Sequence, residues 1–410
     1  MSTHGGYHDP ADLGIAEPED MFASEHYTAV RGNGRQMRSL PLWCYTSERF
    51  YAAEKERIFL RHWNLLERES IVPEVGDYHC MTFFDVPLLI VRGNDRKARV
   101  FANSCRHRGA LVADGSGNCK AFRCPYHFWT YALDGRFNGA PGYKDRDGKP
   151  LITDANKSEF GLHEIDSGTW GGFLFVRFKT GPQTLEQHLG VFVDALASHQ
   201  IEDMVCARKV VYDMDANWKC FVENYIDGYH IPYVHKDSLS RWKYDGVTSF
   251  KSRGLESATL VEHDGSQLLL PFEGFEGFPA MPQIDPDKQR GTIFTMLRPG
   301  MMMTLGNDGA LVFQSEPISA RKSTLTVSSL FPRAYLERDD FEDLAKNYYR
   351  RNEVVVGEDK DIALRQFAGL LSPYARIARL CEDESRLSSL ANWIIDEVVG
   401  SKPSMTIAAG

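Results

Sequence analysis

The sequence lacks several features that would assign it to a large class of proteins. No apolar run approaches the roughly 18 residues that a membrane-spanning helix needs, and a net charge of −9 argues against a general nucleic-acid binder. No G-x-G-x-x-G follows a predicted strand, and the chain has no internal repeat or low-complexity tract. The opening residues, MSTHGGYHDPADLG, lack the charged and apolar regions of a signal peptide. We therefore expect a cytoplasmic protein that does not itself accept hydride from a nicotinamide cofactor.

The composition is that of an ordinary soluble globular protein. The chain has 410 residues, of which 43% are hydrophobic and 25% charged, enough for two or three domains. Its eight cysteines fit a reducing compartment, where they serve as ligands or packed thiols. The cysteines to which the sequence assigns no role are Cys44, Cys80, Cys119, Cys206, Cys220 and Cys381.

Two short motifs combine cysteine with histidine at metal-ligand spacing. They are Cys105-x-His107 and Cys124-x-x-His127, within NSCRHRGALVADGSGNCKAFRCPYHFW. Two thiolates and two imidazoles suit a Rieske [2Fe–2S] centre, in which histidine replaces cysteine on one iron. A structural zinc site uses the same ligand types, but its common pattern places a cysteine pair before a histidine pair. The Cys-then-His order favours the iron–sulfur interpretation.

A second candidate metal site lies about a hundred residues later, in NWKCFVENYIDGYHIPYVH. On a helix Asp227 and His230 would share a face, so that the carboxylate could accept a hydrogen bond from the imidazole nitrogen that does not bind metal. His230 and His235 would point about 140° apart on a straight helix. Pro232 lies between them and can end or kink the helix, which would bring the two histidines together. Two unrelated histidines at a helix end remain the alternative.

A 2-His-1-carboxylate iron site needs a third ligand, which we place in FEDLAKNYYRRNEVVVGEDKDIALRQFAGL. On its helix face Asp359 is flanked by Val355, Val356, Ile362 and Ala363, so it is expected to project toward the core. Glu358 and Asp361 lie near Arg365, as expected of a solvated face. A buried carboxylate is costly unless it is paired or coordinated. Asp359 is therefore the predicted ligand.

Taken together, the two motifs resemble the alpha (large) subunit of the Rieske non-haem iron oxygenases, the aromatic ring-hydroxylating dioxygenase family. The resemblance covers nearly all of the chain from about residue 40, with both motifs in the family's order. It implies that Cys105 and Cys124 hold one cluster iron and His107 and His127 the other. It further implies a mononuclear Fe(II) held by His230, His235 and Asp359, and a bridge between the two centres through Asp227. In that family the bridge joins neighbouring subunits of a three-fold ring, so a homotrimer is implied, and a beta subunit could accompany it.

The loop that carries the second cysteine–histidine pair departs from the family pattern. Phe128 stands where the family usually has glycine, giving CPYHFW in place of CPYHGW. If that position needs a positive φ, a phenylalanine is strained there.

Four basic residues surround the cluster ligands in sequence, namely Arg106, Arg108, Lys120 and Arg123. They could steer an acidic redox partner, or they could pair with carboxylates within the fold.

The expected fold class is α+β. Residues 1–38 are predicted to be a mobile N-terminal arm, 39–63 a helix packing on the catalytic domain, with helical residues from Thr46 to about His62, and 64–178 an all-β Rieske domain. Residues 179–410 mix strands with helices near 184–199, 216–231 and 335–370, which predicts a catalytic domain whose antiparallel sheet is flanked by helices.

The resemblance implies the terminal oxygenase component of a multicomponent system, taking electrons from a separate reductase, with or without a ferredoxin. It would use O2 to hydroxylate a small organic substrate, for which an aromatic compound, as in aromatic catabolism, is the first expectation. GYHIPYVHK is similar to the corresponding segment of choline monooxygenases, so monooxygenation or N-demethylation of a quaternary amine is the alternative.

Two functions without oxygenation stay open for this sequence. The first is a Rieske electron carrier that performs no catalysis, which would lack the second iron. The second is a zinc-stabilised binding module, which would lack iron altogether.

Overall fold

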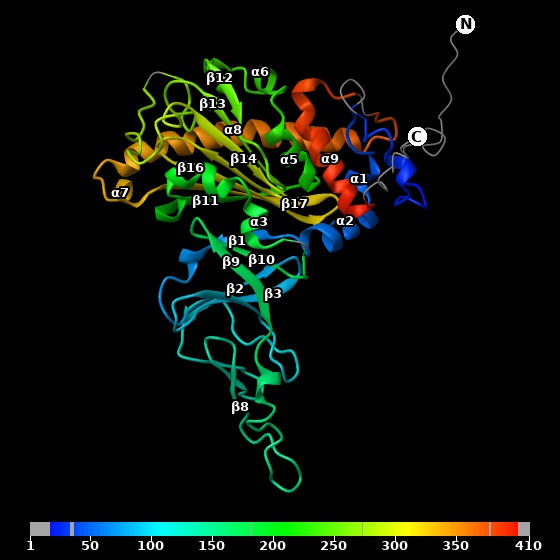
Figure 1. The fold of residues 1–410 in the computed structure, drawn as a ribbon, viewed down its shortest axis with the longest axis vertical. Coiled ribbons are helices and arrows are strands. Elements are labelled where there is room, and N and C mark those ends of the chain that lie inside the picture. The colour runs from blue at the N-terminus through cyan, green and yellow to red at the C-terminus, as the bar shows by residue number, and fades with distance from the viewer. Residues whose placement is uncertain (1–16, 33–36, 182, 273, 377–378, 401–410) are drawn as a thin grey trace, which may run out of the picture. The chain divides into compact units, whose positions relative to one another are not determined.

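The computed structural model describes residues 17–32, 37–181, 183–272, 274–376 and 379–400, and divides the chain into two compact units (Figure 1). The smaller unit comprises residues 60–185, and the larger comprises 1–59 together with 186–410. The smaller unit is all-β and the larger combines a sheet with helices, which confirms the predicted α+β class.

The smaller unit consists of a seven-stranded sheet, in the order β1-β10-β9-β4-β3-β2-β5, and a three-stranded sheet, β6-β7-β8. The strands are β1 (Asn64–Arg68), β2 (Asp77–Phe83), β3 (Val86–Arg92), β4 (Ala98–Ala102), β5 (Ser116–Asn118), β6 (Phe122–Arg123), β7 (Thr130–Tyr131), β8 (Phe137–Gly139), β9 (Glu164–Trp170) and β10 (Phe173–Arg177). Strand β3, VPLLIVR, is an almost continuous apolar run with β-branched residues, as expected of a strand buried on both faces. The hydrophobic core includes both Cys105 and Cys124.

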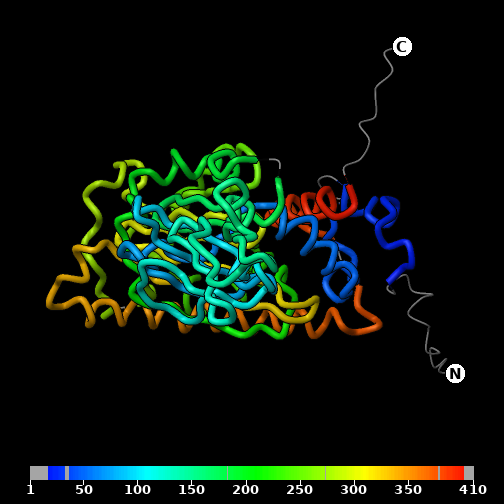
Figure 2. Tube along the Cα trace, turned by 90° about the horizontal axis from the view of Figure 1, so that it is seen from below, coloured from blue at the N-terminus to red at the C-terminus, as the bar shows by residue number. Residues whose placement is uncertain are grey.

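The larger unit is built on a seven-stranded antiparallel sheet in the order β11-β17-β16-β15-β14-β13-β12. Its strands are β11 (Met204–Met214), β12 (Gly246–Ser249), β13 (Glu256–Glu262), β14 (Thr292–Leu297), β15 (Met301–Leu305), β16 (Ala310–Ser319) and β17 (Lys322–Pro332). The helices are α1 (Trp43–Thr46), α2 (Glu48–Glu54), α3 (Leu185–Leu189), α4 (Phe192–Ala195), α5 (Trp218–Ile226), α6 (Ile231–Val234), α7 (Arg333–Leu336), α8 (Phe341–Leu370) and α9 (Ser385–Val398). Figure 2 shows α8, in orange, along one side of the larger unit.

Helix α5 occupies the centre of the larger unit, where it contacts β16, β17 and α8. Asn217 begins the helix, and its side-chain oxygen accepts a hydrogen bond from the Lys219 backbone N–H at 3.1 Å. The Lys219 ammonium pairs with Glu54 of α2 at 2.7 Å, and both side chains are fully buried. Because breaking such a buried pair typically costs about 3–5 kcal/mol, this contact fixes α5 against the N-terminal helices.

The N-terminal region differs from the single helix expected between Thr46 and His62. Helix α1 ends at Thr46, and Ser47 then begins α2 by accepting a hydrogen bond from the Phe50 backbone N–H at 3.2 Å. A serine side chain in extended backbone caps a new helix better than it continues an old one. Helix α2 passes into a π-helical turn at Lys55–Phe59.

The predicted mobile arm, residues 1–38, lies partly outside the described residues, which omit 1–16 and 33–36. In the described part, Met21, Tyr27 and Val30 are buried, and the Tyr27 hydroxyl donates to the Met21 carbonyl at 2.6 Å. This part is therefore packed, because its apolar side chains are removed from water.

The unit boundaries fall at 59/60 and 185/186, near the predicted 63/64 and 178/179. Among the described residues, no helix combines the length and apolarity that crossing a membrane requires.

Candidate metal centres and active site

The four predicted cluster ligands lie on two loops of the smaller unit. Cys105 and His107 follow β4, while Cys124 and His127 lie between β6 and β7. The Nδ1 atoms of the two histidines are 3.2 Å apart. The Cys105 backbone N–H donates to the Ala110 carbonyl and the Cys124 N–H to the Trp129 carbonyl, both at 2.8 Å, so each loop closes on itself. The structure thus brings the imidazole nitrogens together at the distance expected of two ligands on one iron, roughly 3 Å.

The cysteine side of this site is buried and the histidine side is not. Cys105 is 4% and Cys124 1% exposed, whereas His127 is exposed at the surface. The Tyr131 hydroxyl lies 3.1 Å from Cys105 Sγ, a contact that the sequence motif did not reveal. Burial raises the pKa of the Cys124 thiol, and burial together with His127 lowers the pKa of His107. A neutral imidazole is the form that binds a metal.

Phe128 has φ +59°, so the positive φ considered for this position is present. A left-handed conformation at a phenylalanine costs on the order of 1–3 kcal/mol. Its side chain is 52% exposed, and the Arg123 guanidinium stacks over the ring at 4.9 Å. A strained, exposed aromatic residue therefore stands directly beside the predicted cluster ligand His127.

The basic residues around the cluster ligands form no ion pair with a carboxylate among the described residues. Arg106 contacts only backbone oxygen and Arg108 donates to the Tyr126 hydroxyl at 3.2 Å, while Arg123 stacks on Phe128. Pairing within the fold was one of the two interpretations of these charges, and these contacts do not support it. The charges remain available to an acidic partner.

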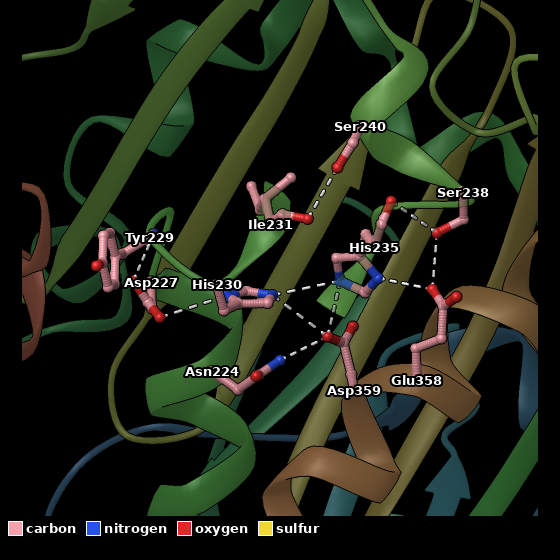
Figure 3. A network of polar contacts seen from close by, with 10 residues as sticks. All are labelled: Asn224, Asp227, Tyr229, His230, Ile231, His235, Ser238, Ser240, Glu358 and Asp359. Carbon is pink, nitrogen blue, oxygen red and sulfur yellow. Dashed lines mark hydrogen bonds and ion pairs between the residues drawn. The ribbon is translucent and has the colours of Figure 1, made fainter. Parts of the chain in front are cut away.

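In the larger unit, His230, His235 and Asp359 converge on one point (Figure 3). The two Nε2 atoms are 3.3 Å apart, and Asp359 Oδ1 lies 3.5 Å from the first and 3.0 Å from the second. Two ligands bonded at about 2.1 Å and at right angles are about 3 Å apart. The donor set and its spacing therefore fit a facial 2-His-1-carboxylate iron site.

The chain reaches this arrangement differently from the sequence prediction. Helix α5 ends at Ile226, and Asp227 has extended backbone with ψ 124°, so Asp227 and His230 do not share a helix face. A second short helix, α6, starts after His230 and carries Pro232 in its first turn, where the missing N–H is not needed. The prediction of a kink at Pro232 was wrong in its mechanism; the break at 227–229 and the short α6 bring the two histidines together.

Each histidine ligand has a carboxylate at its other ring nitrogen. His235 Nδ1 lies 2.7 Å from Glu358 Oε2, which also accepts a hydrogen bond from the Ser238 hydroxyl at 2.7 Å. His230 Nδ1 lies 3.4 Å from Asp227 Oδ2, and the Tyr229 backbone N–H holds the other Asp227 oxygen at 2.7 Å. A hydrogen-bonded carboxylate such as Glu358 fixes the orientation of a ligating imidazole, whereas the Asp227 contact with His230 is electrostatic.

The assignment of Glu358 to a solvated face was therefore incorrect. Its side chain is only 28% exposed and faces His235, because α8 turns its 358–359 edge toward α6. Asn224 was likewise missed; its side-chain N–H donates to Asp359 Oδ1 at 2.7 Å. The sequence held one signal for Asn224, since it precedes Asp227 and His230 in the same motif.

The ionisation of this site favours cation binding. Although burial opposes it, contacts with His230 and His235 hold the pKa of Asp359 well below its usual range. Burial likewise opposes the protonation of His230, but Asp227 and Asp359 outweigh it and raise the pKa of His230 to about 9. A divalent metal at the same point competes with that proton.

A pair of facing imidazoles beside two buried cysteines, together with a facial triad on a separate domain, defines a class of iron-dependent oxidoreductase. Residues 62–152 match the model of the Rieske [2Fe-2S] domain, and residues 201–400 match that of the ring hydroxylating alpha subunit (catalytic domain). The chain belongs to the family of Rieske oxygenase alpha subunits, whose members carry a Rieske cluster and a mononuclear iron.

Curated relatives act on small amines, according to their names. The chain is 25% identical to the glycine betaine monooxygenase oxygenase subunit of Chromohalobacter salexigens, over 91% of this chain and 89% of the relative. It is 28% identical to the putrescine 2-hydroxylase of Ralstonia nicotianae, over 81% and 87%. Its match to the chloroplastic choline monooxygenase of Spinacia oleracea is 28% identical but spans only half of that enzyme, with 54% of this chain covered.

Solved structures share the fold at lower identity. The quaternary ammonium Rieske monooxygenase CntA in complex with L-carnitine gives a TM-score of 0.70 at 22% identity, over 88% of this chain and 96% of that chain. Naphthalene 1,2-dioxygenase from Rhodococcus sp. bound to indole gives 0.68 at 20% identity, over 89% and 95%. These likenesses show the fold and do not distinguish between amine and aromatic substrates.

Proposed function

We propose that this protein is the terminal oxygenase component of a multicomponent Rieske system, which uses O2 and electrons from a partner reductase to oxygenate a small organic molecule. The convergence of His230, His235 and Asp359, with three ligand atoms 3.0–3.5 Å apart, carries this proposal. A Rieske electron carrier without catalysis would have no use for such a triad, and a zinc module would not need two metal sites on separate domains.

The proposed ligands follow from the two sites. Cys105, Cys124, His107 and His127 would hold the [2Fe–2S] cluster, and His230, His235 and Asp359 the iron. When bound, these groups supply one-electron transfer and the activation of dioxygen. Glu358 and Asp227 orient the two imidazoles, and Asn224 fixes the Asp359 oxygen through its 2.7 Å hydrogen bond.

For electron entry, we propose that Asp227 links the iron site to the cluster of a neighbouring subunit in a homotrimer. Its side chain is 15% exposed, and Tyr229 and Tyr233 nearby are 51% and 65% exposed. The histidine side of the cluster site likewise presents exposed Tyr126 and Phe128. Exposed apolar groups next to both sites are typical of contact surfaces. The basic residues around the cluster would receive an acidic reductase or ferredoxin, and a cytoplasmic location stays a prediction.

The substrate is either an aromatic compound, as first expected, or a small amine. The names of the relatives favour the amine: glycine betaine, choline and putrescine are all amines or quaternary ammonium compounds. Tyr225, which follows Asn224 on α5 and is partly buried, contacts the Phe294 and Phe313 rings, with centroid distances of 6.4 and 5.3 Å. Such aromatic surroundings suit an aromatic ring and also a quaternary ammonium group.

The test is metal and sulfide analysis with low-temperature EPR on anaerobically purified protein. We expect about three irons and two acid-labile sulfides per chain and a reduced Rieske signal. Oxygen uptake that depends on a reductase and on one of the two substrate classes would complete the assignment. Two irons after iron reconstitution would leave an electron carrier, and zinc without sulfide would overturn the proposal.

A further inference from the structure

The larger unit contains a buried arginine without a carboxylate partner among the residues that the structure describes. Arg351 of α8 is 3% exposed, and its one hydrogen bond runs from Nε to the Gln267 carbonyl at 3.0 Å. Burial lowers the pKa of Arg351 to about 10, so the side chain is still cationic at neutral pH. Buried cations are usually paired, because burial without a partner costs several kcal/mol.

The side chain of Gln267, next to Arg351, also has a hydrogen-bond donor that lacks a full partner. Gln267 is 2% exposed, and among the described residues its Nε2 meets only the Tyr244 hydroxyl, through a contact too loose to be a well-formed hydrogen bond. Since the Arg351 side chain reaches the Gln267 backbone, the two groups lie in one region of the interior. The Nη donors of Arg351 have no acceptor among the described residues, and the amide N–H beside them has only the loose Tyr244 contact. A carboxylate offers two oxygens that fit a guanidinium fork.

This region lies within reach of the metal ligands. Arg351 and Glu358 are seven residues apart on α8, which places them on nearly the same face and about 10 Å apart along the helix axis. Four groups act electrostatically on the Arg351 charge, namely Asp359, Tyr225, Tyr244 and Glu358. A separation of about 10 Å matches a small organic molecule, with its reacting carbon beside the triad and its far end at Arg351.

A simpler explanation is that Arg351 balances the negative charge of Asp359 and Glu358. These carboxylates already contact His235, and Asp359 also contacts His230 and Asn224. A counter-charge alone leaves the Nη donors of Arg351 without an acceptor among the described residues, whereas a carboxylate of a ligand supplies one.

Resting on the proposed oxygenase function, we infer that Arg351 and Gln267 bind a carboxylate group of the substrate. The carboxylate belongs either to an aromatic acid or to a zwitterionic quaternary amine. In both cases Arg351 and Gln267 determine specificity, and they touch the end of the substrate that does not react.

The binding test uses the full chain with both metals and without a reductase, so that turnover does not enter. Titration calorimetry would compare benzoate with benzamide and glycine betaine with choline, two pairs in which one member bears the carboxylate. We expect that, in one of the two pairs, the compound with a carboxylate binds at least tenfold more tightly than the compound without it. The pair that shows this difference identifies the substrate as an aromatic acid or a zwitterionic quaternary amine. In Arg351→Met and Gln267→Leu this preference should fall to within about twofold, whereas Arg350→Met, at a 62% exposed neighbour on α8, should retain it.

A ligand-free measurement covers the possibility that the variants change the fold. If Arg351 awaits an anion, Arg351→Met should keep full iron content and a melting temperature equal to or above that of the wild type. If Arg351 is a structural counter-charge, the variant should melt lower and lose iron, and the inference falls. Equal binding within both probe pairs by the wild type also overturns it. Failure of the proposed function is separate, since it shows as missing iron or sulfide in the unmodified protein.

Discussion

The two candidate metal centres are built on opposite principles. The predicted cluster ligands lie on two neighbouring loops, with their histidine side at the surface. The arginines around it have no carboxylate partner within the described part of the chain. The triad is largely enclosed and has a carboxylate behind each histidine, one of which, Glu358, is 123 positions away from His235 in the chain. The first arrangement suits exchange of electrons with another molecule, and the second suits chemistry that must be held in one geometry.

The difference extends to protonation. Around the cluster, burial and a neighbouring imidazole lower the pKa of His107. At the triad, two carboxylates overcome burial and raise the pKa of His230 to about 9. The histidines thus have basic neighbours at the cluster site and acidic neighbours at the triad.

The largest effect is expected from Asp359→Ala. Loss of one of three ligands should remove the mononuclear iron and abolish turnover, while the cluster on the other unit keeps two irons and its EPR signal. Iron analysis with EPR of the reduced protein would check this. Loss of both signals together would show that the two centres are not independent.

Asp227→Ala should leave about three irons per chain but lower turnover by at least a hundredfold, because the contact to His230 Nδ1 and the link to the cluster are removed. Stopped-flow reoxidation of the reduced cluster in the presence of substrate and O2 would locate the defect. Asp227→Asn, which keeps the size of the side chain, is the control for packing. Undiminished turnover in the alanine variant would exclude the bridge.

Glu358→Gln should weaken iron binding by about 10–100-fold, since it removes the anionic partner of His235 but leaves all three ligands. Iron titration of the metal-depleted protein would measure the affinity. Asp361→Asn, on the neighbouring exposed position of the same helix, serves as the matched control. An unchanged iron affinity would remove Glu358 from the site.

Charge reversal at Lys120 and Arg123 should slow electron delivery by a partner reductase several-fold at low salt and flatten its dependence on ionic strength. The iron site should be unaffected, because these residues belong to the other unit. Rates of cluster reduction between low and high salt would decide; an unchanged salt dependence would end the steering hypothesis.

The smallest effect is expected from Phe128→Gly. Relief of the positive φ should offset the lost contact with Arg123 and the added flexibility of glycine, so the free energy of unfolding should change by no more than about 1 kcal/mol. Thermal unfolding would measure this. A slower cluster reduction in a variant of unchanged stability would show that the ring contacts a partner.

The sequence predicted most of the fold and all three residues of the triad, for identifiable reasons. Strands such as Val86–Arg92 have strong local patterns, and the cluster motifs are contiguous, so their ligands needed no long-range information. The burial of Asp359 could be read from its apolar neighbours on one helix face. The contacts of Glu358, Asn224 and Gln267 depend on how α8 packs against α5, α6 and the 264–272 segment, and no periodicity encodes that packing.

The larger unit is discontinuous, with residues 60–185 inserted between its first and last parts. Helix α9, near the end of the described chain, packs against α2 and the π-helical turn (red and blue in Figure 2). The Arg57 guanidinium donates to the Val398 carbonyl. During synthesis the inserted domain, residues 60–185, can therefore fold before α9 is made and can pack against α2. Until α9 leaves the ribosome, the apolar faces of the N-terminal helices stay open, and premature termination before Ser385 should yield a folded cluster domain attached to an incomplete catalytic one.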